Sequence, residues 1–222
     1  MWPSSADQLA AVQASLAVAS PAPWRPGAGM LATGGCVVCF ARGQGGPGAA
    51  GDRAWAAATV LRGHEAIADA TVTGVAGAAY MAGLLALREG RCLEAAVRAL
   101  GVRPDVLLVD ATGRDHPRGA GLALQLGAVL DLPTVGVTHR PLMAAGPWPE
   151  DREGATSALL LDGEPVGVWL RTRTWARPVA VHPGWRTTID AAVETVQRAG
   201  CAFRTPEPLR RARRLARTAR AG

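Results

Sequence analysis

The chain has 222 residues, 49% of them hydrophobic, which is enough for a full core, so we expect a single domain over residues 1–222 and a monomer. No apolar run is long enough to span a membrane, and the start of the chain has no charged segment followed by an apolar one, so we expect a cytoplasmic protein without membrane contact. The formal net charge is +6 and every basic residue is Arg, which suits a polyanionic partner, although a GC-rich genome would give the same composition.

The first half of the chain predicts a helix followed by an antiparallel meander of three strands. Residues 5–19 are rich in Ala, with apolar residues at helical spacing, and Ser4 or Ser5 can cap the helix. The strands are expected at 30–40, 54–61 and 66–74, with a long Gly-rich loop at 41–51 and a tight turn at 63–64.

The second half alternates helices with strands. Helices are predicted at 83–100, 119–130, 187–199 and 206–220, with Gly101 ending the first of them in the C′ position. Strands are predicted at 105–110, 134–138, 158–161, 166–171 and 178–181. A three-strand meander followed by β-α-β units is the order of a ribonuclease-H-like α/β fold, with a mixed sheet flanked by helices.

The four cysteines do not predict a metal centre. Cys36 and Cys39 have the CxxC spacing, but there is no second CxxC and no nearby pair of His residues, which argues against zinc. Both lie in an apolar stretch that reads as a strand, where successive side chains face opposite sides. We therefore expect ordinary buried thiols.

The segment from Pro104 to Arg118 is the most informative part of the chain. An apolar run ends in a carboxylate, Asp110, and a Gly-bearing turn then presents His116 and Arg118. A charged group at the end of a buried strand is costly unless it has a partner, such as a metal, an Arg or a substrate. Because ligands gather at the carboxyl ends of strands in open α/β sheets, this segment predicts a binding site.

Several motifs in the same order resemble the endonuclease V (deoxyinosine 3′-endonuclease) family. Residues 80–89 resemble its Tyr-Ile-Pro-Gly-Leu-Leu-Ala-Phe-Arg-Glu, and residues 110–118 its Asp-Gly-x-Gly-x-x-His-Pro-Arg. Residues 121–137 resemble its Gly-x-Ala-x-His-x-Gly-x-x-x-Asp-x-Pro-x-x-Gly-Val, and residues 206–212 its Pro-x-x-x-Arg-x-Ala. The resemblance covers nearly the whole chain and implies the ribonuclease-H-like fold.

The resemblance also implies a DNA-repair nuclease that uses Mg²⁺ to hydrolyse a phosphodiester near deoxyinosine or inosine in DNA or RNA. Mg²⁺ prefers hard oxygen ligands, and it polarises the phosphate and helps to generate the attacking hydroxide. Carried over by position, Glu89 and Asp110 are the implied metal ligands and catalytic carboxylates. His116 is the implied catalytic residue that contacts the substrate or a metal-bound water.

Three positions depart from the pattern that the resemblance implies. The first-strand Asp falls on Val37, or on Cys36 if the register slips by one, and no carboxylate lies between residues 30 and 51. The Lys of the family falls on His139, and its late His falls on Trp185. With an incomplete ligand set for Mg²⁺, we expect cleavage to be greatly weakened or absent, because catalytic residues that act as a unit lose most of the rate when one is removed.

Compensation for these losses stays open at the level of sequence. Asp115 could reach the metal or orient His116, His139 could contact a phosphate, and His182 could reach the place expected for Trp185. Each of them is otherwise a solvated or hydrogen-bonded side chain.

Substrate recognition is implied by a second group of residues. Tyr80 falls on the wedge Tyr, which would stack where a base has left the helix, although it could also be a half-buried residue at the end of a strand. The other implied substrate-binding residues are Gly83 and Leu85 (base pocket), Gly136 (base pocket), Arg88 (a phosphate contact or a structural salt bridge), Arg118 (phosphate) and His139 (phosphate). The Arg-rich stretch 210–217 either contacts nucleic acid or forms a solvated face.

Three hypotheses follow. The chain is a metal-dependent endonuclease acting on inosine-containing DNA or RNA, a catalytically inactive nucleic-acid-binding pseudoenzyme of the same fold, or a paralogue with no role on nucleic acid.

Overall fold

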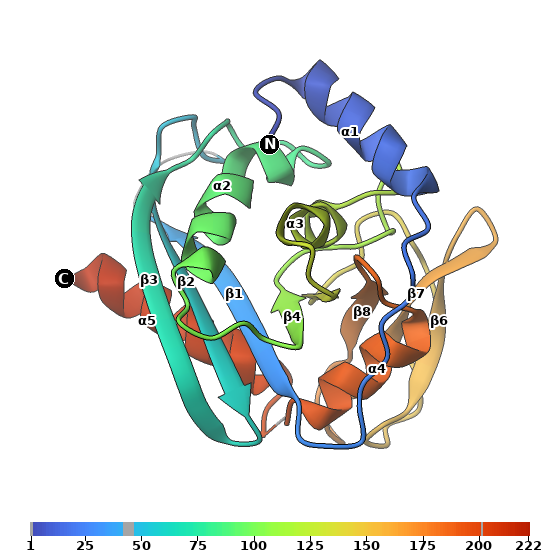
Figure 1. The fold of residues 1–222 in the computed structure, drawn as a ribbon. Coiled ribbons are helices and arrows are strands. Elements are labelled where there is room, and N and C mark those ends of the chain that lie inside the picture. The colour runs from blue at the N-terminus through green and yellow to red at the C-terminus, as the bar shows by residue number, and fades with distance from the viewer. Residues whose placement is uncertain (1, 42–46, 201) are drawn as a thin grey trace.

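A computed structural model describes residues 2–41, 47–200 and 202–222, and it contains a mixed sheet with helices on both faces (Figure 1). The helices are α1 (Ala6–Val18), α2 (Leu85–Arg98), α3 (Leu122–Leu130), α4 (Ile189–Arg198) and α5 (Glu207–Ala221). The strands are β1 (Ala32–Phe40), β2 (Arg53–Arg62), β3 (Glu65–Val75), β4 (Val106–Val109), β5 (Thr134–Thr138), β6 (Thr156–Leu161), β7 (Glu164–Leu170) and β8 (Val179–Pro183). No helix in the described ranges has the length and apolar character needed to cross a membrane.

The strands form one sheet in the order β3-β2-β1-β4-β5-β8-β7-β6. The pairs β1–β4 and β4–β5 are parallel, and the remaining pairs are antiparallel. The predicted meander, the β-α-β units and the predicted fold class are confirmed. The parallel strands β1, β4 and β5 all end at one edge of the sheet, and the segments that follow β4 and β5 carry Asp110 and His139.

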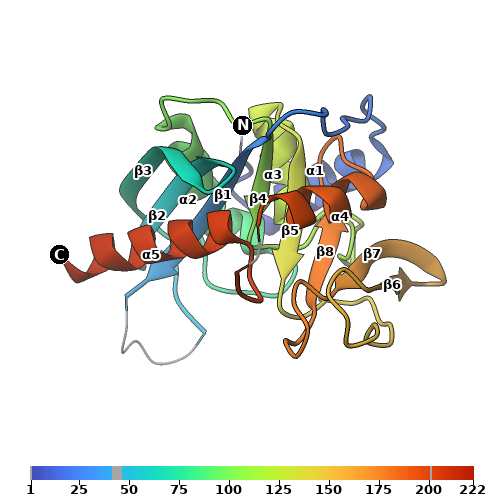
Figure 2. The same cartoon turned by 90° about the horizontal axis from the view of Figure 1, so that it is seen from below.

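Helices α2 and α3 cover one face of the sheet, with α1 packed against both of them, whereas α4 and α5 cover the other face. Figure 2 shows α5 crossing the strands of the meander. Gly35 allows α5 to lie directly on β1, because a Cβ atom at this position would be 2.4 Å from the backbone carbon of Pro208. This close approach fixes which side of α5 faces the end of β4.

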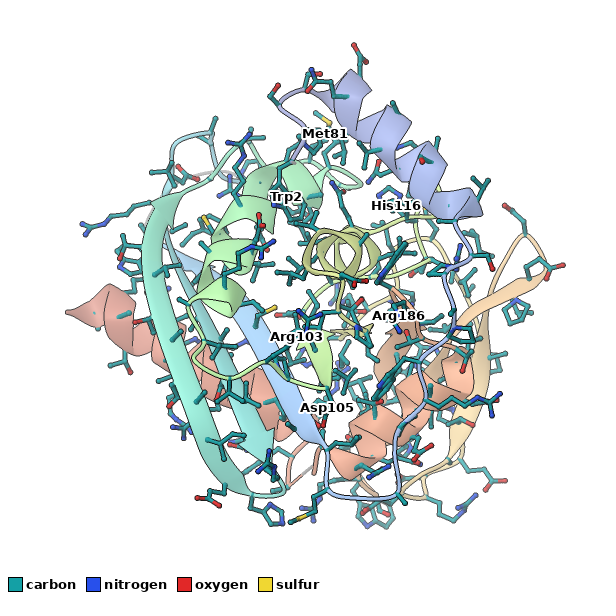
Figure 3. All side chains as sticks on the ribbon, viewed as in Figure 1. Trp2, Met81, Arg103, Asp105, His116 and Arg186 are labelled. Carbon is teal, nitrogen blue, oxygen red and sulfur yellow. The ribbon has the colours of Figure 1, made fainter. Side chains whose placement is uncertain are left out.

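The N-terminal segment is fastened to the face that carries α2. Trp2 is buried against Gly90, and its indole Nε1 donates a hydrogen bond to Glu94 at 2.6 Å; Figure 3 shows Trp2 over α2. Ser5 caps α1 as predicted, and Arg114 donates to the carbonyl oxygen of Ala17 at 2.9 Å in the last turn of that helix. Together these contacts hold α1 beside the turn that follows β4.

The predicted element boundaries differ from the structure mainly at glycines. The helix expected from residue 83 begins at Leu85, and the helix expected from residue 119 begins at Leu122, because Gly83 (φ 78°) and Gly119 (φ 65°) have left-handed backbone conformations. Gly101 was predicted to occupy the C′ position of the first of these helices, but α2 ends at Arg98 with Ala99 as its C-cap, and Gly101 has no positive φ. Of the Gly-rich loop predicted at 41–51, residues 42–46 lie outside the described residues, as does Cys201.

Candidate nucleic-acid site

The two implied metal ligands lie close to each other at the carboxyl ends of the parallel strands. Glu89 is on α2 and Asp110 follows β4. Burial, together with the nearby negative charge of Asp110, raises the pKa of Glu89 to about 8, although Arg88 opposes this shift. The structure therefore brings these two carboxylates together, as the sequence implied.

The missing first-strand Asp falls on Val37 or Cys36, and Cys36 is the one of the two that lies on the α2 face, with Glu89 nearby. Cys36 pairs with Val109 in the parallel register and is fully buried on the α2 face. Burial, followed by the charges of Asp110 and Glu89, raises the pKa of its thiol. Val37 points to the opposite face, where it packs with Leu209 of α5. The thiols of Cys36 and Cys39 are unpaired and lie on opposite faces of β1, as expected.

Asp110 has a cationic partner from the last helix. Arg213 of α5 donates from Nη2 to Oδ2 of Asp110 at 2.6 Å, and the Asp110 side chain is 39% exposed. The sequence left open whether the strand-end carboxylate meets a metal, an Arg or a substrate. In the structure the partner is an Arg.

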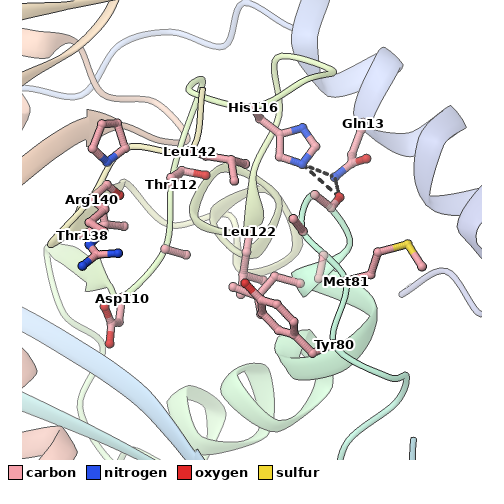
Figure 4. Close-up of a pocket in the computed structure, with 16 residues that line it drawn as sticks. Gln13, Tyr80, Met81, Asp110, Thr112, His116, Leu122, Thr138, Arg140 and Leu142 are labelled. Carbon is pink, nitrogen blue, oxygen red and sulfur yellow. Dashed lines mark hydrogen bonds between the residues drawn. The ribbon is translucent and has the colours of Figure 1, made fainter. Parts of the chain in front are cut away.

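A pocket of about 280 Å³ opens beside Asp110 (Figure 4). Its apolar wall includes Leu85 and Leu122, and Tyr80 is 50% exposed at the edge. Two of the three expected pocket residues, Gly83 and Leu85, line it, and so does Tyr80, the expected wedge. The other lining residues are Gln13, Met81, Ala82, Ala86, Asp110, Ala111, Thr112, His116, Thr138, Arg140, Pro141 and Leu142. The structure thus gathers Tyr80 and Asp110 around one small hollow.

Gly136, which was also expected to line the pocket, is not among its lining residues. It is buried beneath the turn after β4, where an added Cβ would lie 2.3 Å from the carbonyl oxygen of Ala111. Its small size allows that turn to pack on β5.

His116 has protein partners at both ring nitrogens. Nε2 lies 3.0 Å from the carbonyl oxygen of Gly83, and Nδ1 lies 3.1 Å from the backbone nitrogen of Arg118. A neutral ring with the proton on Nε2 satisfies both contacts, and burial lowers the pKa of His116, which favours that neutral form. His116 therefore fastens the Gly83 turn to its own loop.

Arg118 and Gln13 complete this connection. Arg118 donates to the Gly83 carbonyl oxygen at 2.9 Å and to Oε1 of Gln13 at 2.6 Å. Gln13 is 1% exposed, and its Nε2 lies 3.4 Å from Nε2 of His116. The sequence did not single out Gln13; its position in the middle of an Ala-rich helix was the available signal.

Arg88 forms the structural salt bridge that was one of its two predicted roles. Its side chain is 4% exposed and donates hydrogen bonds to Asp52 at 2.8 Å and to the carbonyl oxygens of Ala49 and Ala78. The guanidinium also lies over the ring of Phe40. The hydrogen bond from Arg88 is the main cause that lowers the pKa of Asp52. Arg88 joins the loop before β2 to the segment that carries Tyr80.

Asp115 and His182 are both fully buried. The Asp115 carboxylate accepts backbone hydrogen bonds from Leu142, Met143 and Ala144 at 2.6, 2.8 and 2.8 Å, so it organises one wall of the pocket. Burial lowers the pKa of His182 to about 4, against the opposing charge of Asp115. The compensating role considered for Asp115 as a metal ligand has no support in these contacts.

Trp185 does not lie at the metal position, and that expectation is corrected. Its backbone pairs with Thr134, the first residue of β5, whereas the carboxylate site lies beyond the other end of the parallel strands. His139 does follow the carboxyl end of β5, and its Nε2 lies 2.9 Å from Oγ1 of Thr205. His182 lies elsewhere, because it pairs with Gly136 of β5 and its Nε2 lies 3.4 Å from Oγ1 of Thr138.

Comparison with known proteins identifies the family. The sequence pattern of the Endonuclease V family matches residues 45–214, which is most of the chain. This chain belongs to the endonuclease V family. An Endonuclease V of Thermus thermophilus is 44% identical over 133 residues, a match that spans 59% of each chain. The chain therefore covers less than two thirds of that curated relative.

Solved endonuclease V structures share the fold over almost the entire chain. The Endonuclease V of Streptomyces avermitilis is 34% identical and superposes with a TM-score of 0.87, covering 98% of this chain and 94% of that one. The Endonuclease V of Ciona intestinalis, solved in complex with DNA that contains an inosine followed by a ribo-adenosine, is 18% identical with a TM-score of 0.82 and covers 98% of each chain. The ribonuclease-H-like fold is thereby confirmed.

The side chains present at the carboxylate site do not fit the Mg²⁺ ion that the endonuclease V resemblance implies. Mg²⁺ requires hard oxygen ligands, and the third side chain here is the thiol of Cys36, while Asp110 is already paired with a guanidinium. Within the described ranges, no group of three or more His, Cys, Asp and Glu side chains is arranged to hold a metal ion.

Proposed function

We propose that this endonuclease V family member binds DNA or RNA containing a deaminated purine (inosine), and that its metal-dependent cleavage is weak or lost. One observation carries the proposal. The base-sized pocket has Tyr80 at its edge and Asp110 in its wall, and the same Asp110 is paired with Arg213.

The recognition half of the proposal rests on the shape and lining of the pocket. Its volume of about 280 Å³ is close to the lower end of the roughly 300–1,000 Å³ that is usual for small-molecule sites, which suits one nucleobase. Tyr80 and Met81 are 50% and 59% exposed, so both can stack against neighbouring bases when one base leaves the helix. The inosine-containing DNA bound by the Ciona relative supports this choice of ligand.

In this proposal some residues contact the displaced base and others hold the edge of the pocket in place. Tyr80 occupies the space beside the displaced base, and Gly83, Leu85 and Leu122 exclude water from it. The contacts of His116, Arg118 and Gln13 with the Gly83 turn keep that edge of the pocket in place. Rigid positioning of the turn reduces the conformational entropy lost on binding.

The catalytic half rests on what faces Asp110. Cys36 supplies neither a charge nor a hard oxygen ligand, because burial keeps its thiol protonated, and Arg213 supplies a positive charge of its own. We therefore propose no step through a metal ion. The Arg213 contact favours the second candidate function, a nucleic-acid-binding pseudoenzyme, over an active nuclease.

Matched oligonucleotides that differ only in one inosine or adenine test the function. We expect tighter binding of the inosine strand by fluorescence anisotropy, and little or no cleavage with Mg²⁺ or Mn²⁺. Cleavage by the wild type that disappears in the Asp110→Ala variant would show an active nuclease instead. Equal or absent binding of the two strands would favour a paralogue with no role in inosine recognition.

The single domain over residues 1–222, the monomeric state and the cytoplasmic location remain proposals. Light scattering after size-exclusion chromatography tests the monomer directly, since a dimer would double the measured mass.

A further inference from the structure

A second hollow lies on the other side of the Asp110–Arg213 pair. Asp110 lines the base-sized pocket, whereas Arg213 lines a groove of about 720 Å³ along α5. The basic side chains of this groove are His139, Arg204, Arg210, Arg213, Arg214 and Arg217. The ion pair therefore separates a pocket sized for a base from a groove lined by cations.

The cations of the groove outnumber the carboxylates that contact them. Glu207 pairs with Arg210 at 2.7 Å and with Arg214 at 3.9 Å, and Asp110 pairs with Arg213. In the part of the chain that the structure describes, no carboxylate forms an ion pair with Arg204 or Arg217. The groove thus keeps an excess of positive charge, which a polyanion would neutralise.

Arg213 contacts Asp110 and also lines the groove. A guanidinium has five N–H donors in one plane, and Asp110 occupies only part of this set. The Arg213 side chain is 23% exposed and lines the groove, so donors remain for a phosphate. The pocket and the groove meet at this ion pair, since Asp110 lines the one and Arg213 lines the other.

We propose that the guanidinium of Arg213 takes the place of a divalent metal ion at Asp110, and that the α5 groove binds a nucleic-acid phosphate through arginine without metal. This inference rests on the proposed function only in taking a nucleic acid as the ligand. A metal site would attract the phosphate through the ion; here the protein supplies the cation itself. Binding is then independent of Mg²⁺ and falls as salt concentration rises.

The same helix provides a matched control. Arg211 also forms an ion pair with a carboxylate of the sheet, Asp69 of β3, and its side chain is 30% exposed. It does not line the groove. The Arg211→Gln and Arg213→Gln variants therefore remove the same charge from the same helix and each break one ion pair.

The experiment measures binding of a single-stranded oligonucleotide without inosine, in EDTA and in Mg²⁺, over a series of salt concentrations. We expect wild-type affinity to be equal in both buffers. Arg213→Gln should weaken binding on the order of tenfold and reduce the slope of log K against log salt by about 0.7, the value for one phosphate contact on a single strand. Arg211→Gln should leave both values nearly unchanged, and thermal melts verify that each variant is folded.

Three outcomes would overturn the inference: wild-type binding that requires Mg²⁺, an equal effect of the two substitutions, or no binding at all. Failure of the proposed function is a separate result. It would appear as equal affinity for inosine and adenine strands while metal-independent binding through Arg213 persists.

Discussion

The Nε2 atom of His116 lies 3.0 Å from the carbonyl oxygen of Gly83, in the turn that directly follows Tyr80 and Met81. The same oxygen accepts a hydrogen bond from Arg118, so two side chains of the Asp110–Arg118 segment hold one atom of the pocket edge. This arrangement gives His116 a positioning role at the pocket, and Figure 4 shows its ring beside Gln13 and away from Asp110.

Replacement of His116 by Ala should therefore loosen the pocket edge. We expect amide hydrogen exchange to accelerate in residues 80–84 and the preference for an inosine strand to decrease, with binding of ordinary strands largely kept. His64→Ala, at an exposed turn, is the control. Unchanged exchange together with a complete loss of function would instead point to direct contact between His116 and the substrate.

Arg88→Ala should destabilise the whole domain, because it removes a buried guanidinium with several acceptors and leaves Asp52 without its partner. We expect Tm to fall by roughly 5–10 °C, in line with losses from broken buried ion pairs. The same substitution at Arg152, which is 71% exposed beside Glu150, should change Tm little. Equal shifts would mean that Arg88 adds no more than a surface charge.

Cys36→Asp and Val37→Asp should differ sharply, because the two side chains face opposite sides of β1. Val37→Asp places a carboxylate against Leu209 and should cost about 3 kcal/mol or more of unfolding free energy with or without metal. Cys36→Asp combined with Arg213→Gln creates three carboxylates at one place, so added Mg²⁺ should raise its Tm. Stabilisation of Val37→Asp by Mg²⁺ would contradict this assignment of the faces.

The sequence does not determine which of Cys36 and Val37 faces the α2 side of β1. Strand β1 is covered by helices on both faces, and its residues from Ala32 to Val37 are all buried. Polar and apolar residues therefore do not alternate, and nothing in the sequence fixes which face each residue occupies. The close approach of α5 to Gly35 shows which face of β1 turns toward that helix.

The strand-end position of Asp110 was predictable, because an uninterrupted apolar run ends there. The ion-pair partner of Asp110, Arg213, was not predictable from the sequence. The helix α5 has Arg on several sides, and Arg213 is distinguished from Arg211 only by the direction in which each faces. Trp185 was misplaced for a related reason, since a short motif gives the turn but not the end of the sheet at which the turn lies.

Burial of His182 as a neutral ring should make part of the stability depend on pH. The pKa of His182 is lowered from 6.5 to about 4 in the folded state, so the unfolded chain binds a proton more readily. The contribution of His182 to stability is then complete above pH 6.5 and is lost as pH falls towards 4, whereas the raised pKa of Glu89 acts in the opposite direction over the same range. Urea unfolding between these limits should therefore show less destabilisation by acid in His182→Gln than in the wild type. The same pH dependence in both proteins would show that His182 contributes nothing to it.

The central claim is that Arg213, and no divalent ion, is the cation at Asp110. Titration of Mn²⁺ into the protein, followed by the loss of the free-ion EPR signal, tests it most directly. We expect the wild type to leave the signal of free Mn²⁺ undiminished, and the Cys36→Asp, Arg213→Gln double variant to bind one ion. Binding of one Mn²⁺ by the wild type that disappears in Asp110→Ala would contradict the claim.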